Sequence, residues 1–226
     1  MMHSTGFSHF IGQTDWVSQS LLIILTLMSC ASWYLIFSKT FRYWKTRGRA
    51  RLFLQNFWQA ENIHEVESYL KKNGVQDPFS HLVHHGLRAA QQHQNKTSKH
   101  MIEAGSADEF LTRALRRAIE QDTARLEYGH TLLASVAASA PFLGLFGTVL
   151  GIYHALLAIS ASGQGSLDQV AGPVGEALIM TALGLAVAIP AVLAYNAFTR
   201  ANRLVLSELD GFAHDFFAFM STGMKI

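Results

Sequence analysis

Glu176 is the one charged side chain in the thirty residues from Val170 to Thr199, which are almost all apolar or small. About 20 apolar residues of helix cross a bilayer, and a carboxylate at that depth costs on the order of 2.5–3.5 kcal/mol. The same helical face carries Met180 and Leu183, so the carboxylate should lose water, which favours its protonated form. Glu176 is therefore a candidate proton-carrying group. The alternative is a carboxylate that only stabilises the positive end of the helix dipole.

Two stripes of small residues flank this acid and each contains one threonine. At helical spacing they comprise Ala137, Pro141, Gly144, Thr148, Gly151 and Ala155 in residues 131–160, and Ala177, Thr181, Gly184, Ala188 and Ala191 in the run with Glu176. Small residues let membrane helices approach closely, and hydroxyls can bond across them. The stripes therefore predict either tight helix packing or a narrow lumen lined by Thr148 and Thr181. Glu176 lies about 140° around an ideal helix from Thr181, so it does not share the centre of its stripe.

Three apolar runs must position these residues. The first spans 17–37 without a charge, and all 18 Lys and Arg residues lie outside residues 1–38 and 126–199. The positive-inside rule then predicts three transmembrane helices, with the N-terminus outside and the C-terminus in the cytoplasm. A cleaved signal peptide is disfavoured because no basic segment precedes the first run.

The predicted organisation is all-α, with two very long helices that extend into the cytoplasm. The predicted segments are a periplasmic N-terminus (1–16), a first transmembrane helix (17–38), a cytoplasmic helical domain (39–130), a second transmembrane helix (131–160), a periplasmic turn (161–168), a third transmembrane helix (169–199) and a cytoplasmic C-terminal helix (200–226).

Helix signals fill in this outline. Residues 52–105 are predicted to form short helices, broken at Gly74, Asp77-Pro78, Asn95 and Gly105. Ser106 and Glu109 form a capping box, after which one unbroken helix is expected from about Ala107 to about Ile159. The third helix is expected to continue as an amphipathic helix that packs through a stripe of Val205, Leu209, Phe212, Phe216 and Phe219.

Other chemistries find little support. His81, His84 and His85 have helical spacing but no cysteine or carboxylate close in the chain, which favours a solvated helix face over a metal site. The sequence has no GxSxG, HExxH or phosphate-loop motif, and Cys30 is its only cysteine. The basic residues flank apolar runs, so the net charge of +2 does not indicate nucleic-acid binding. No catalytic residue, metal or cofactor is expected, and the chain is not predicted to be an enzyme.

Several longer motifs resemble the MotA/TolQ/ExbB proton-channel family. They are residues 140–149 (APFLGLFGTV), 175–178 (GEAL), 181–185 (TALGL) and 188–192 (AIPAV). Within the family the chain is most similar to the ExbB branch, through residues 151–156 (GIYHAL) and 212–215 (FAHD). Two residues depart from the family pattern: Leu150 stands where tryptophan is frequent, and Met180 where alanine is usual.

The resemblance implies a multi-pass protein of the bacterial inner membrane that forms a homopentamer around a central pore. It implies ExbD-like single-span helices inside the pore, each with a proton-relaying aspartate, and a TonB-like partner that energises outer-membrane uptake of iron-siderophores and cobalamin. By matching position, Glu176 would be the acid of the proton path, and Thr148 and Thr181 the polar residues that face the ExbD aspartate. A TolQ-like role in the Tol-Pal envelope system and a passive membrane scaffold are the alternatives.

Overall fold

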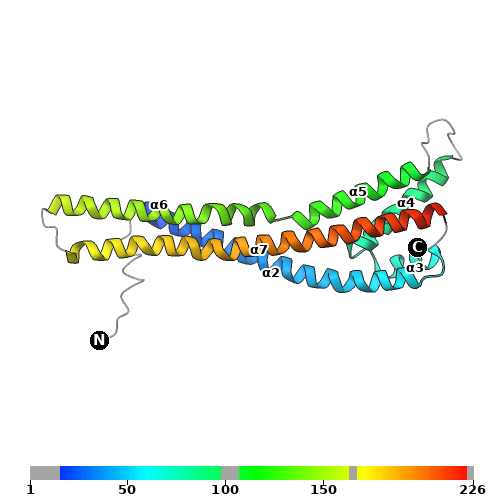
Figure 1. Ribbon diagram of the computed structural model, residues 1–226, viewed down its shortest axis with the longest axis horizontal. Helices are drawn as coiled ribbons and strands as arrows, with labels where there is room; N and C mark the ends of the chain where they lie inside the picture. The colour runs from blue at the N-terminus through cyan, green and yellow to red at the C-terminus, as the bar shows by residue number, and fades with distance from the viewer. Residues whose placement is uncertain (1–15, 98–106, 163–166, 223–226) are drawn as a thin grey trace. The chain divides into compact units, whose positions relative to one another are not determined.

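All the secondary structure in the described part of the chain is α-helical, as the sequence predicts. The computed structural model describes residues 16–97, 107–162 and 167–222. Its helices are α2 (Trp16–Gln59), α3 (Ile63–Asn73), α4 (Pro78–Thr97), α5 (Ala107–Glu127), α6 (His130–Ser162) and α7 (Leu167–Thr222), as Figure 1 shows. Most of the predicted N-terminal segment, Gly105 and Ser106, and the centre of the turn at 161–168 lie outside the described residues.

The chain divides into two units with different compositions. The apolar unit comprises residues 1–37 and 129–198, and the polar unit comprises residues 38–128 and 199–226. Every Lys and Arg of the sequence falls in the polar unit. Within the described residues, three helical stretches are long and apolar enough to cross a membrane, in α2, in α5–α6 and in α7.

The apolar unit is built from the first part of α2, the whole of α6 and the first part of α7. Figure 1 shows α6 and this part of α7 side by side. Their shared core consists of Leu21, Leu25 and Leu35 from α2, Leu133, Val136 and Ala140 from α6, and Met180, Ala188 and Ala191 from α7. Large apolar side chains also cover the outside, including Phe142, which is 71% exposed. Such a surface needs lipid or another apolar partner.

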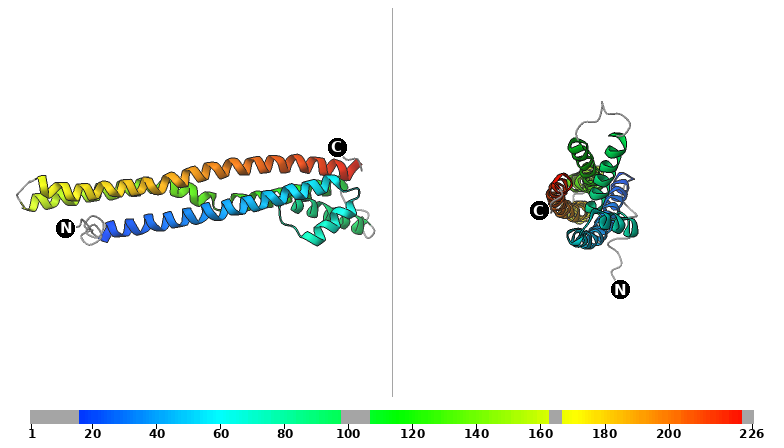
Figure 2. Two further views of the ribbon diagram at one scale, coloured as in Figure 1. Left: turned by 90° about the horizontal axis from the view of Figure 1, so that it is seen from below. Right: turned by 90° about the vertical axis from the view of Figure 1, so that its right-hand side faces the viewer.

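The polar unit is packed around aromatic side chains. The predicted stripe on the C-terminal part of α7 is confirmed: Leu209, Phe212 and Phe216 are buried in a core with Phe53 and Phe57 of α2. The rings of Phe57 and Phe212 meet edge to face, with centroids 5.0 Å apart. Figure 2 shows α3 and α4 beside the C-terminal end of α2, where they close this core.

Two of the predicted helix breaks are confirmed in the polar unit. Helix α3 ends at Asn73 because Gly74 adopts a left-handed φ of 73°, which favours glycine. Helix α4 begins after Asp77, whose carboxylate accepts hydrogen bonds from the backbone N–H groups of Phe79 and Ser80, both at 3.0 Å. The break predicted at Asn95 is wrong, because α4 continues to Thr97.

The first and second long helices also differ from the prediction. Short helices were expected from residue 52, but α2 continues unbroken to Gln59 because Phe53 and Phe57 need one continuous face to reach the aromatic core. The unbroken helix expected from Ala107 to Ile159 is interrupted at Tyr128-Gly129. Gly129 has a φ of 79°, outside the range of a right-handed helix, so α5 must end before it and α6 begins anew at His130.

Candidate functional site between α6 and α7

The backbones of α6 and α7 are in direct contact at two glycines. A Cβ on Gly184 would lie 2.6 Å from the carbonyl oxygen of Ala140 and 3.0 Å from the Cα of Gly144. A Cβ on Gly144 would lie 2.7 Å from the carbonyl oxygen of Met180. Because backbone atoms cannot swing aside, only glycine fits at either position. The two small stripes therefore face each other within one chain.

Further along the same contact, glycines on α6 leave room for side chains of α7. Gly151 packs on Ala177, and a Cβ on Gly151 would come within 2.8 Å of the Ala177 Cβ. The side chain of Met180, which is only 2% exposed, packs against Gly147. Met180 is one of the two departures from the family pattern, and the missing side chain of Gly147 leaves space for its extra volume. Gly147 was not among the site residues predicted from spacing, although it lies inside the motif at 140–149.

Thr148 and Thr181 meet at the centre of this contact. Their hydroxyl oxygens are hydrogen-bonded to each other across α6 and α7. The Thr148 hydroxyl also lies 2.9 Å from the carbonyl oxygen of Gly144, and the Thr181 hydroxyl lies 3.5 Å from the same oxygen. Each hydroxyl has one proton to donate and can accept from another donor. If Thr148 donates to Gly144, Thr181 donates to Thr148, which makes a short chain of exchangeable protons.

The other predicted small residues belong to the same unit. Ala188 is buried in the core, Ala137 is partly buried against it, and Pro141 lies within α6. Because Pro141 has no N–H, the carbonyl of Ala137 loses its helical donor.

Glu176 is half-buried and is the tenth residue of α7, which begins at Leu167. The stabilising effect of a helix dipole on a carboxylate falls off within the first turn. A helix-start role therefore explains Glu176 poorly. Met180, one turn further on, is buried, and Leu183 and Val187 on the same face are packed against the core. The carboxyl thus stands at the end of an apolar face and about 140° around the helix from Thr181.

The polar unit contains a histidine–aspartate pair that sequence spacing does not reveal. His81 is buried, and its Nδ1 lies 2.9 Å from Oδ2 of Asp122, a residue 41 positions away on α5. The prediction of a solvated face is therefore wrong for His81, because α4 and α5 pack through it. Among the described residues, no group of three or more potential ligands could hold a metal ion.

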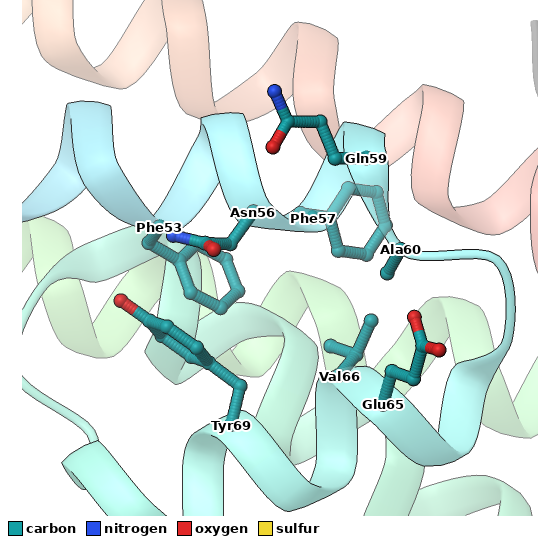
Figure 3. A pocket seen from close by; sticks show the side chains of 8 residues that line it. All are labelled: Phe53, Asn56, Phe57, Gln59, Ala60, Glu65, Val66 and Tyr69. Atoms are coloured by element: carbon teal, nitrogen blue, oxygen red, sulfur yellow. The ribbon is translucent and has the colours of Figure 1, made fainter.

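A cavity of about 190 Å³ lies between the end of α2 and α3, as Figure 3 shows. Its walls are the rings of Phe53, Phe57 and Tyr69 with Val66. Two of its polar side chains already bond to nearby backbone: Glu65 accepts the N–H of Glu61 at 3.0 Å, and the Asn56 amide donates to the carbonyl of Leu52 at 2.6 Å. Gln59 and Tyr69 add further polar groups to a lining that also contains aromatic rings.

These features define a class of protein. Within the described residues three helical stretches can span a bilayer, and the apolar unit has no Lys or Arg. This unit holds the Thr148–Thr181 hydroxyl pair and, on α7, the half-buried carboxyl of Glu176. The chain is a multi-span helical membrane protein with a few polar residues inside its apolar unit.

The comparisons with known proteins specify the family. The profile of the MotA/TolQ/ExbB proton channel family matches residues 75–210. The biopolymer transport protein ExbB of Xanthomonas campestris pv. campestris is 44% identical, over 98% of this chain and 90% of that protein. ExbB of Neisseria gonorrhoeae is 37% identical, over 89% and 90%. TolQ of Pseudomonas aeruginosa, a Tol-Pal system protein, is 29% identical, over 96% and 93%. The chain belongs to the MotA/TolQ/ExbB proton channel family.

Proposed function

We propose that this protein is an ExbB-type subunit that lets protons cross the bacterial inner membrane and uses their flow to drive a partner. In this proposal it assembles as a pentamer, N-terminus outside and C-terminus in the cytoplasm, around single-span ExbD-like helices. A TonB-like protein then transmits the work to outer-membrane transporters of iron-siderophores and cobalamin.

The observation that carries the proposal is the Thr148–Thr181 hydroxyl pair in the contact between α6 and α7. Thr181 lies on α7, the helix that also carries Glu176. A carboxyl can bind and release a proton, and hydroxyls can pass a hydrogen bond onward but cannot store a charge. The third group of a relay, a carboxylate that faces the hydroxyls, is expected from the ExbD-like partner. The remaining small residues of the two stripes would allow the helices to pack closely and line the pore.

Two further observations support the details. The restriction of all Lys and Arg to the polar unit supports placing that unit in the cytoplasm. The identity of 44% to an ExbB, against 29% to a TolQ, supports the ExbB role.

Glu176→Gln tests the proton path because it removes the titratable group and preserves the shape of the side chain. We expect proton flux through the reconstituted complex, and uptake of an iron-siderophore in cells, to fall to background. Glu208→Gln is the matched control, since Glu208 is an exposed acid on the same helix in the polar unit. Unchanged flux and uptake in Glu176→Gln, at normal membrane levels, would instead support a passive scaffold.

A TolQ-like role is the second candidate, supported by the near full-length similarity to TolQ of P. aeruginosa. Complementation separates the two roles. The ExbB role predicts that the gene restores siderophore uptake in an ExbB-deficient strain, whereas the TolQ role predicts that it restores envelope integrity in a TolQ-deficient strain. The native mass of the purified complex then tests the pentamer.

A further inference from the structure

The last turn of α5 is capped by side chains from two other helices. The ammonium nitrogen of Lys39, on α2, donates to the carbonyl oxygens of Leu126 and Tyr128, both at 2.8 Å. The amide nitrogen of Asn202, on α7, donates to the carbonyl of Leu126, also at 2.8 Å. All of these residues belong to the polar unit. Three hydrogen bonds therefore join three helices at the point where α5 stops.

These bonds match the needs of a helix end. The last carbonyls of a helix have no partner within the helix and carry the negative end of its dipole. A lysine ammonium there satisfies both the hydrogen bonding and the charge. Asn202 is only 9% exposed and Lys39 is partly buried, and their bonds to the carbonyl of Leu126 are both partly shielded from water. Burial, together with the charge of Arg42, lowers the pKa of Lys39 from its ordinary range.

The residue after this capped turn is Gly129, where the break occurs. On the side of the apolar unit, its Cα faces the side chain of Leu35, and an added Cβ would lie 3.0 Å from a Leu35 methyl group. Its carbonyl accepts the N–H of Leu133, which starts the hydrogen bonding of α6. Of the three chain crossings between the two units, α2 and α7 are unbroken helices. The crossing from α5 to α6 alone relies on a turn.

We propose that Lys39 and Asn202 together lock the end of α5, so that the helix stops at the Tyr128-Gly129 turn. The lock is a property of the polar unit and can be tested without reference to protons. The competing interpretation is that Lys39 is one of several basic residues that only fix the orientation of α2 at the membrane surface.

Amide hydrogen exchange over residues 122–133, in the full-length protein purified in its complex, tests the lock directly. Lys39→Met removes two of the three hydrogen bonds, and we expect the amides of the last turn of α5 to exchange about tenfold faster, because the carbonyl of Tyr128 loses its donor and that of Leu126 keeps only Asn202. Lys45→Met is the matched control, since Lys45 is an exposed lysine on the same helix. Lys39→Arg, which retains charge and two donors, should restore slow exchange. Equal exchange in Lys39→Met and Lys45→Met would overturn the proposal.

Asn202→Asp supplies a second test that keeps the side-chain volume and replaces the donor with an acceptor. We expect exchange in the same turn to rise again. Because Lys39 and Asn202 share the carbonyl of Leu126, each single variant leaves it one donor and only the double variant leaves it none, so the double variant should show more than the product of the two single effects. Independent, multiplicative effects would contradict a common lock.

Discussion

The apolar and polar units hold their helices together in opposite ways. In the apolar unit, α6 and α7 meet backbone to backbone at Gly144 and Gly184. In the polar unit, Phe57, Phe212 and Phe216 fill the space between helices with rings. Lipid tails are as apolar as the side chains, so burial alone does not drive helices together in a membrane and close contact must do so. In water, burying aromatic surface supplies the driving force.

The two units also differ in their polar contacts, which are hydroxyl bonds in one and charged pairs in the other. The apolar unit has no Lys or Arg and joins its helices through the threonine hydroxyls. The polar unit buries a His81–Asp122 pair, and Arg125 contacts the same carboxylate at 3.4 Å. Substitutions that enlarge a side chain at the helix contact should therefore lower stability most in the apolar unit. Substitutions that remove a buried ring should lower it most in the polar unit.

Removing a ring from the polar unit should produce the largest effect on stability. Phe216 is fully buried, with 0% exposure, and Phe216→Ala should lower the free energy of unfolding by about 3–5 kcal/mol through lost burial and a cavity. Leu204→Ala is the control on the same helix, because Leu204 is 56% exposed, and it should change stability by about 0.5 kcal/mol or less. Thermal unfolding of the purified protein measures both. A similar loss in the two variants would show that the aromatic core does not dominate this unit.

Adding one methyl group should produce the next largest effect, in the apolar unit. Gly184→Ala forces a Cβ against the backbone of α6, and we expect a loss of about 1–3 kcal/mol as the helices separate. Gly175→Ala is the matched control on α7, since its new Cβ would meet nothing within 4 Å. There alanine should be neutral or stabilise the helix by up to about 1 kcal/mol. Equal destabilisation by both substitutions would remove the distinction between the two units.

Much of the fold follows from local patterns in the sequence. The three apolar runs, the stripe that buries Leu209 and Phe212, and the break at Gly74 each depend on residues close together in the chain. The break at Gly129 escaped prediction because one glycine within an apolar pattern is compatible with a helix. The donors that bond to the carbonyls just before the break, Lys39 and Asn202, are more than 70 residues away in the chain.

For the candidate site, the sequence predicted which residues share a helical face but not what each face contacts. Spacing placed Thr148 and Thr181 on small stripes but could not decide between a lumen and a contact between two helices. In the structure the stripes meet within one chain, so the hydroxyls bond to each other. His81 illustrates the same limit: its partner Asp122 is 41 residues away, and sequence spacing contains no signal for that pairing.

The smallest predicted effect is a dependence of stability on pH that belongs to the polar unit alone. Burial lowers the pKa of His84 and of His85, and the positive charge of Arg88 and the neighbouring histidines lowers both further. The unfolded chain therefore takes up these protons at a higher pH than the folded chain. Stability should be full above the ordinary histidine pKa of about 6.5 and should decrease as pH falls below it.

Two buried acids of the polar unit, Asp77 and Asp122, change the stability in the opposite direction to His84 and His85. Burial raises the pKa of Asp77 and of Asp122, so their contribution to stability is largest in acid and is lost as pH rises through the carboxyl range. Between pH 8 and 6 the histidines should therefore dominate. Thermal unfolding across this range should show a slope that weakens in His84→Asn and His85→Asn and persists in His64→Asn, whose side chain is 88% exposed. An unchanged slope in both His84→Asn and His85→Asn would show that these two histidines do not cause the pH dependence.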